Sequence, residues 1–162
     1  MGPDLRPRPW HWSHSAVVPT RLLVESGDPV LAVSDLRCFE DAGFEVSLCL
    51  GPGAGRGGCP LLRGVPCPAV AAADVVLQGP EQDTALTRAI RRLHPRVAVV
   101  VEQPPPAPGQ ATSPPLAGQV LPGAVRADGC VALSFACSID TQVEVVRRAA
   151  AGRRRAGPEP AV

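Results

Sequence analysis

Two Cys-Pro pairs are the most distinctive chemical feature of the sequence. Cys59 and Cys67 each precede a proline, and the imidazoles of His11 and His14 lie near the N-terminus. Zinc sites need three or four converging thiolates or imidazoles, usually from tightly spaced cysteine pairs. Cys59 and Cys67 are too far apart for one such pair, so zinc binding by these four residues would require the N-terminal segment to fold back. A redox thiol pair is the other alternative, and simple packing of the thiols is favoured over both.

Cysteine usage and the N-terminal residues also predict a compartment. Structural disulfides are rare in the reducing cytosol, so the six cysteines are expected to be thiols or ligands. We assign Cys38, Cys49, Cys130 and Cys137 to packing. The first fifteen residues lack the apolar stretch of a secretory signal. No segment reaches the ~18 apolar residues of a membrane span. The sequence therefore predicts a cytoplasmic protein without membrane attachment.

Residues 53–58 satisfy the pattern G-x-G-x-x-G of dinucleotide-binding loops. That pattern works when its third glycine opens a long helix whose amino end faces the pyrophosphate. Here Cys59 and Pro60 follow at once, and more prolines come shortly after them. A flexible loop is therefore favoured over a phosphate site, and no organic cofactor is predicted.

Several residue types on which enzymes rely are missing. The chain has no lysine, tyrosine or asparagine, and all sixteen basic residues are arginine. A lysine nucleophile, a tyrosine acid and a Cys-His-Asn triad are thereby excluded. No G-x-S-x-G elbow is present, and His94 stands before a proline at an expected helix end. The sequence predicts a protein that is not an enzyme, and its composition is typical of GC-rich codons and thus of a high-GC bacterium.

The distribution of charge and proline narrows the class of partner. A formal net charge of +1 predicts no general attraction to nucleic acid or to anionic membranes. Five arginines crowd residues 147–155, which we interpret as the start of a solvated tail. Prolines dominate residues 104–118, as in a stiff spacer or a polyproline ligand. The expected partner is another protein, with the oligomeric state left open.

Hydrophobic periodicity predicts the elements that must position these residues. Short unbroken apolar runs are typical of strands buried on both faces, and residues 21–24 add a short run that suits an edge strand. Thr141 and Glu144 have the spacing of a capping box, with Ile139, Val143, Val146 and Ala150 expected to face inward. The expected strands are 30–33, 44–50, 74–77, 97–101 and 130–135, and the expected helical segments are 36–42, 68–73, 84–93 and 141–150.

This alternation predicts an α/β domain with three layers, in which a mostly parallel five-stranded sheet lies between helices. The domain is expected over residues 25–151, between disordered tails at 1–24 and 152–162. Right-handed crossovers bring the carboxyl ends of parallel strands to one edge, where ligands of such sheets bind. Asp35 and Gln78 are the candidate residues at that edge.

The order of elements resembles the flavodoxin-like group and, within it, the receiver domains of bacterial response regulators. The resemblance covers about residues 28–150. It implies an acidic pair after the first strand, a phosphate-accepting aspartate after the third, a serine or threonine after the fourth and a lysine after the fifth. Only Asp35 matches the acidic pair, the acceptor position falls on Gln78 or Gly79, and Glu102 follows the fourth strand. The chain therefore resembles a receiver without phosphorylation chemistry, and we expect a non-catalytic regulatory or protein-interaction domain.

Overall fold

Five parallel strands form the centre of the protein. The computed structural model describes residues 18–53, 58–80, 84–103, 129–134 and 137–155. The strands pair in the order β2-β1-β3-β4-β5, and every pair is parallel. This arrangement confirms the predicted parallel sheet. The strand bounds are β1 Arg21–Glu25, β2 Glu45–Cys49, β3 Val75–Gln78, β4 Ala98–Gln103 and β5 Val131–Ser134.

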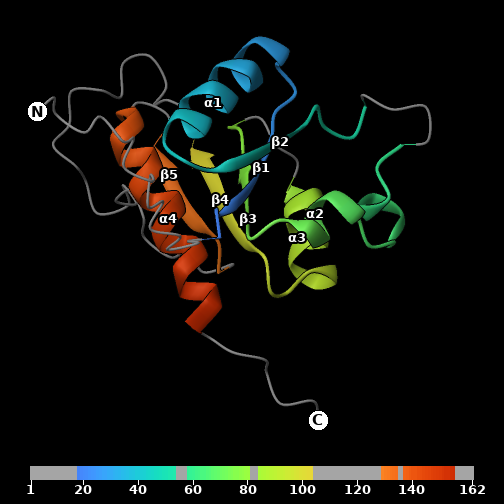
Figure 1. Ribbon diagram of the computed structural model, residues 1–162. Coiled ribbons are helices and arrows are strands. Elements are labelled where there is room, and N and C mark those ends of the chain that lie inside the picture. The colour runs from blue at the N-terminus through green and yellow to red at the C-terminus, as the bar shows by residue number, and fades with distance from the viewer. Residues whose placement is uncertain (1–17, 54–57, 81–83, 104–128, 135–136, 156–162) are drawn as a thin grey trace, which may run out of the picture.

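Helices cover both faces of the sheet and complete the three layers (Figure 1). Helices α1 (Pro29–Asp41) and α4 (Ile139–Arg155) pack on one face. The short 3-10 helix η1 (Leu61–Arg63), α2 (Pro68–Ala72) and α3 (Thr84–Leu93) pack on the other. Within the described part of the chain, no helix is both long and apolar enough to cross a membrane.

The N-terminal part of the fold differs from the prediction. Residues 30–33 belong to α1 and not to a strand, because Asp28 caps this helix and Pro29 occupies its first turn. The Asp28 carboxylate accepts a hydrogen bond from the backbone N–H of Val30 at 2.8 Å. The first strand is instead Arg21–Glu25, which lies between β2 and β3 and is not an edge strand. The expected tail over residues 1–24 therefore contains most of β1.

The start of α4 was also predicted imperfectly. Ser138 caps it, since its hydroxyl accepts a hydrogen bond from the backbone N–H of Thr141 at 3.3 Å. Ile139 is consequently exposed, whereas Val143, Val146 and Ala150 face the core as expected. The helix continues to Arg155, so the domain boundary expected at residue 151 falls inside it. The proline-rich segment 104–118 lies outside the described residues.

Alternation along the strands divides the core between the two faces. Leu22 and Val24 of β1 belong to the cluster under α1 and α4, whereas Leu23 belongs to the cluster under α2 and α3. Val100 of β4 lies in the first cluster and Val76 of β3 in the second. Side chains two residues apart on a strand share a face. Successive residues at the end of a strand therefore point to opposite faces of the sheet, which determines the geometry of the site.

Candidate functional site

The carboxyl ends of β1 and β3 meet where the chain order reverses across the sheet. β1 pairs with β2 on one side and with β3 on the other, so the crossovers that follow β1 and β2 leave in opposite directions. Such a point opens a crevice in which parallel α/β sheets bind ligands. β1 ends in Glu25 and β3 ends in Gln78, and both side chains are buried. This places the predicted residue Gln78 at the expected edge.

Glu25, Gln78 and Thr87 form a chain of buried hydrogen bonds. Gln78 Nε2 donates to Glu25 Oε2 at 3.1 Å, and the Thr87 hydroxyl of α3 donates to Gln78 Oε1 at 2.8 Å. The amide of Gln78 is thus oriented from both ends. Burial raises the pKa of Glu25 from its ordinary value of 4.5 to about 7, and the hydrogen bond from Gln78 opposes part of that rise.

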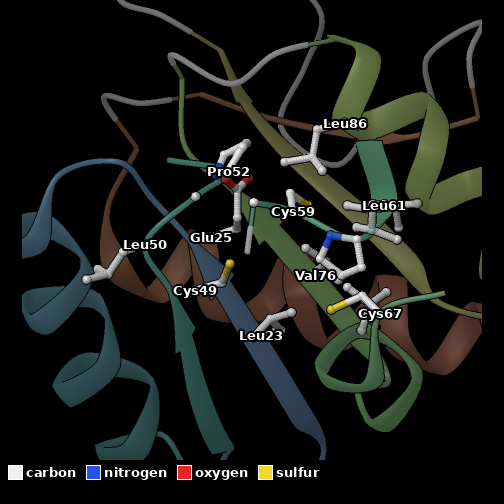
Figure 2. Close-up of a pocket in the computed structure, with 15 residues that line it drawn as sticks. Leu23, Glu25, Cys49, Leu50, Pro52, Cys59, Leu61, Cys67, Val76 and Leu86 are labelled. Atoms are coloured by element: carbon white, nitrogen blue, oxygen red, sulfur yellow. The ribbon is translucent and has the colours of Figure 1, made fainter. Parts of the chain in front are cut away.

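A cavity of about 330 Å³ opens beside Glu25 on the face of the sheet that α2 and α3 cover, and we call it the Glu25 pocket. Glu25 is 3% exposed, and its Oε1 atom has no hydrogen-bond partner among the described residues. Figure 2 shows Glu25 between the sheet and the segment that contains Pro52. Apart from Glu25 and its cysteines, the pocket is lined by apolar residues and glycines: Leu23, Leu50, Gly51, Pro52, Gly58, Pro60, Leu61, Val70, Val76, Leu86 and Ile90.

Three cysteines come together around this pocket. Cys59 and Cys67, the predicted pair, line it with Cys49, which had been assigned to packing (Figure 2). Burial is the largest of the effects that raise the pKa of the Cys49 thiol. Among the described residues, no group of three or more histidine, cysteine or acidic side chains is arranged to hold a metal ion. His11 and His14 lie outside those residues, so the zinc interpretation gains no support from the structure.

His94 has a structural role at the base of this region. Its Nε2 accepts a hydrogen bond at 3.0 Å from the backbone N–H of Cys67, the residue that precedes α2. Burial lowers the pKa of His94 and so favours the neutral ring, which this bond requires. The Gly-rich segment leads to the short η1 and then to α2, which confirms that no long helix follows it. Residues 54–57 of that segment lie outside the described residues.

Glu102 marks a second acidic region on the opposite face of the sheet. It lies near the end of β4, is 8% exposed and faces α1. Burial, together with the like charge of Asp35, raises the pKa of Glu102 to about 7. Asp35 does not follow a strand as predicted, because it lies within α1, half-buried. Its own pKa is raised by burial, and it lies on the side of α1 that faces this edge.

Gly79, the residue after β3, lies beside the same acidic region, and a side chain at this position would point towards it. A Cβ atom on Gly79 would lie 4.0 Å from Glu102 Oε2 and 3.8 Å from Ser26 Oγ, which are ordinary contacts. Ser26 and Gly27 directly follow β1, so no acidic pair occupies that position. The acidic region thus brings together Glu102, Asp35 and Ser26 around a glycine.

Sequence reasoning missed Glu25 because it placed the first strand at residues 30–33. Two signals were available. Residues 22–24 are an unbroken apolar run, and Asp28-Pro29 is a typical helix start. A strand that ends at Glu25 and a helix that begins at Pro29 follow from these two signals together.

The comparisons with known proteins agree with this architecture. No family model matches the sequence, and no curated protein matches it. A CheY-like response regulator receiver domain protein from Methanospirillum hungatei has a similar structure, with a TM-score of 0.56 and 12% identity, covering 86% of this chain and 99% of that one. A receiver domain protein from Clostridium thermocellum gives a TM-score of 0.57 at 15% identity, covering 85% and 98%.

A third similar structure carries a different description. A putative pilus assembly protein (cpaE) from Burkholderia thailandensis gives a TM-score of 0.54 at 23% identity, covering 82% of this chain and 98% of that one. At these identities the likeness concerns the fold, and it confirms the predicted flavodoxin-like class. The chain therefore has the fold of response-regulator receiver domains.

Proposed function

We propose that this chain is a non-catalytic regulatory domain that acts through contact with another protein, on a receiver fold that does not accept a phosphoryl group. The observation that carries the proposal is the end of β3. Gln78 stands there with its amide held between Glu25 and Thr87, and Gly79 follows with no side chain. Neither residue offers the carboxylate that receivers, by resemblance, phosphorylate.

The surroundings of this position support the same proposal. Ser26 and Gly27 stand where the resemblance requires an acidic pair, and Glu102 stands near the end of β4 where it requires a hydroxyl. The chain contains no lysine, so the ammonium group expected after the fifth strand is also missing. Glu25 keeps one carboxyl group at the end of β1, but the missing acceptor carboxylate and lysine argue for a role that does not depend on phosphotransfer.

The surface of α1 supports action through protein contacts. Val30, Leu31 and Val33 lie in its first half and are 77%, 42% and 46% exposed. Large apolar side chains gathered on one helix of a soluble domain are typical of a surface that a partner covers. A cytoplasmic location belongs to this proposal, and the thiols of Cys38, Cys49, Cys59 and Cys67, none of them in a disulfide, suit a reducing compartment.

The first test is phosphorylation. The full chain is incubated with acetyl phosphate and Mg²⁺ beside a receiver that has its acceptor aspartate, and intact mass is measured before and after hydroxylamine. We expect phosphorylation of the comparison receiver alone. One hydroxylamine-sensitive phosphoryl group per molecule of this chain would overturn the proposal.

The second test concerns the partner. Val30→Glu and Val33→Glu are compared with Val65→Glu, which changes a 50% exposed valine outside α1. We expect the two α1 variants to lose a cross-linked partner that the wild-type chain and Val65→Glu both retain. Equal cross-linking by all three variants would exclude α1 as the contact surface.

A further inference from the structure

We propose that the Glu25 pocket binds a small organic amine that carries one positive charge and a compact apolar body. The proposal rests on the juxtaposition of an apolar pocket with one buried carboxyl oxygen that lacks a hydrogen-bond partner among the described residues. It does not depend on the proposed function, because the α1 surface and the end of β3 are tested separately.

The size of the pocket limits the ligand. Its volume of about 330 Å³ is at the lower end of the range for small-molecule sites, roughly 300–1,000 Å³. An apolar cavity of about 150 Å³ in another protein accommodates benzene. The Glu25 pocket therefore has room for one ring with a short substituent, and it is too small for a dinucleotide.

The lining selects the charge of the ligand. Of the described residues that line the pocket, Glu25 is the one with a carboxyl group, Cys49, Cys59 and Cys67 add thiols, and the others are apolar or glycine. Among the described residues, no arginine or histidine lines the pocket, so an anionic ligand would meet the carboxylate without a compensating cation from them. A neutral hydrocarbon would leave Oε1 of Glu25 buried without a hydrogen bond, which is costly. An ammonium group removes this cost because its N–H donates to that oxygen.

The carboxyl group is already oriented for such a ligand. Gln78 holds Oε2 at 3.1 Å and is itself held by Thr87, whereas the other oxygen is buried without a hydrogen-bond partner among the described residues. Oε1 points to Gly51, where a Cβ atom would lie 3.4 Å away. Gly51 also lines the pocket and packs against this buried oxygen, so a ligand reaches Oε1 when the Gly51 backbone shifts. A preorganised acceptor of this kind avoids part of the entropic cost of binding.

The test uses benzylamine as the ligand, with benzyl alcohol and benzoate as matched compounds of the same shape. Binding to the full chain at pH 8 is followed by NMR of the methyl groups. We expect benzylamine to shift the methyl signals of Leu23, Val76 and Ile90, which line the pocket. We expect it to bind about tenfold more tightly than benzyl alcohol, as for a hydrogen bond to a charged group. Benzoate should produce no shifts.

Two variants locate the effect. Glu25→Gln keeps the shape of the side chain and removes its charge, so it should reduce benzylamine affinity to that of benzyl alcohol. Glu102→Gln makes the same change on the opposite face of the sheet and should leave that affinity unaltered. The proposal is overturned if benzylamine and benzyl alcohol bind equally, if Glu25→Gln binds benzylamine like the wild type, or if the shifts fall away from the pocket.

A measurement on the wild-type chain keeps the proposal testable if Glu25→Gln does not fold. Between pH 8 and pH 5.5 benzylamine stays cationic while the Glu25 carboxylate gains a proton. The other ionisable side chains that the described residues place around the same pocket are the Cys49, Cys59 and Cys67 thiols, and burial already raises the pKa of Cys49. We expect about a tenfold loss of benzylamine affinity at pH 5.5, with benzyl alcohol unchanged. An affinity independent of pH would contradict the proposal.

Discussion

Glu25 and Glu102 are the same residue type at the same edge of one sheet, yet they lie on opposite faces. Glu25 continues the face that packs against α2 and α3, has Gln78 as a hydrogen-bond donor and borders an apolar pocket. Glu102 continues the face that packs against α1 and has the like charge of Asp35 nearby. Burial raises the pKa of both to about 7.

This comparison shows how the fold separates two buried carboxyl groups at one edge of the sheet. Gly79 opens towards the Glu102 face, so the position that would carry an acceptor aspartate looks into the acidic region. Gln78, one residue earlier, points to the opposite face and donates a hydrogen bond to Glu25. Because neighbouring strand residues point to opposite faces, the proposed loss of phosphotransfer concerns one face and the proposed ligand pocket lies on the other.

The largest expected effect is on the pH dependence of stability. Both glutamates have folded-state pKa values above their ordinary 4.5, so the folded protein holds more protons than the unfolded chain between pH 4.5 and 7. The free energy of unfolding should therefore be highest near pH 4.5 and fall as the pH rises through 7. The expected fall is about 3 kcal/mol for each glutamate. Urea unfolding across this pH range measures it.

Substitution separates the two contributions. Glu25→Gln and Glu102→Gln should each remove about half of the fall and make the protein more stable than the wild type at pH 8. Glu45→Gln, at an exposed position of β2, is the matched control. A wild-type profile that is flat or rises between pH 5 and 8 would show that neither carboxyl is buried as described.

The next effect concerns the hydrogen-bond chain on the Glu25 face. Gln78→Leu removes the donor to Glu25 Oε2 and leaves the Thr87 hydroxyl without its acceptor. We expect a loss of about 2–3 kcal/mol in the free energy of unfolding at pH 8. Thr87→Val removes just the hydrogen bond from the Thr87 hydroxyl to Gln78 Oε1, so it should lower the free energy of unfolding by about 1 kcal/mol. Chemical denaturation of both variants tests the order, and equal losses would contradict it.

A pair of glycines provides a third contrast between the faces. Gly51 has φ of +85°, so Gly51→Ala forces a side chain into the left-handed region and towards Glu25 Oε1. We expect a cost of about 1–2 kcal/mol. Gly79→Ala, on the Glu102 face, meets no atom closer than 3.7 Å and should change stability by less than about 0.5 kcal/mol. Thermal unfolding measures the stability of both variants. A Gly51→Ala variant as stable as the wild type would contradict the prediction.

The smallest expected effect is that of Asp35. Asp35→Asn removes the like charge beside Glu102, so it should increase the free energy of unfolding at pH 8 by a fraction of about 1 kcal/mol. At pH 5 the increase should be smaller, because Glu102 is then protonated. Urea unfolding at both pH values checks this, and a loss of stability at pH 8 would contradict it.

Much of the fold could be predicted from the sequence because strong local signals agreed. The apolar runs of β3 and β4 and the stripe Leu86, Ala89 and Ile90 of α3 each had one interpretation. The first strand was missed because residues 30–33 are as apolar as a buried strand. Val30, Leu31 and Val33 are exposed on α1, which depends on tertiary packing and not on the local sequence. Gln78 was found at the edge, since it ends an obvious strand.

The Glu25 pocket could not be predicted from local sequence patterns, for a different reason. Its residues come from β1, β2, β3, α2 and α3 and from the segment around Pro52, so their proximity depends on the whole topology. Cys59 and Cys67 stand out in the sequence because each precedes a proline, whereas Cys49 joins them at the pocket through the position of β2 in the sheet. Asp35 was assigned to the edge for a wrong reason, and it reaches Glu102 through α1.

The central claim is that Glu25 and Glu102 belong to two separate environments on opposite faces of one sheet. Side-chain carboxyl ¹³C NMR titration of both residues in the wild type, Gln78→Leu and Asp35→Asn tests this directly. We expect Gln78→Leu to raise the pKa of Glu25 without moving Glu102, and Asp35→Asn to lower the pKa of Glu102 without moving Glu25. Joint movement of both pKa values in either variant, or two wild-type values near 4.5, would contradict the claim.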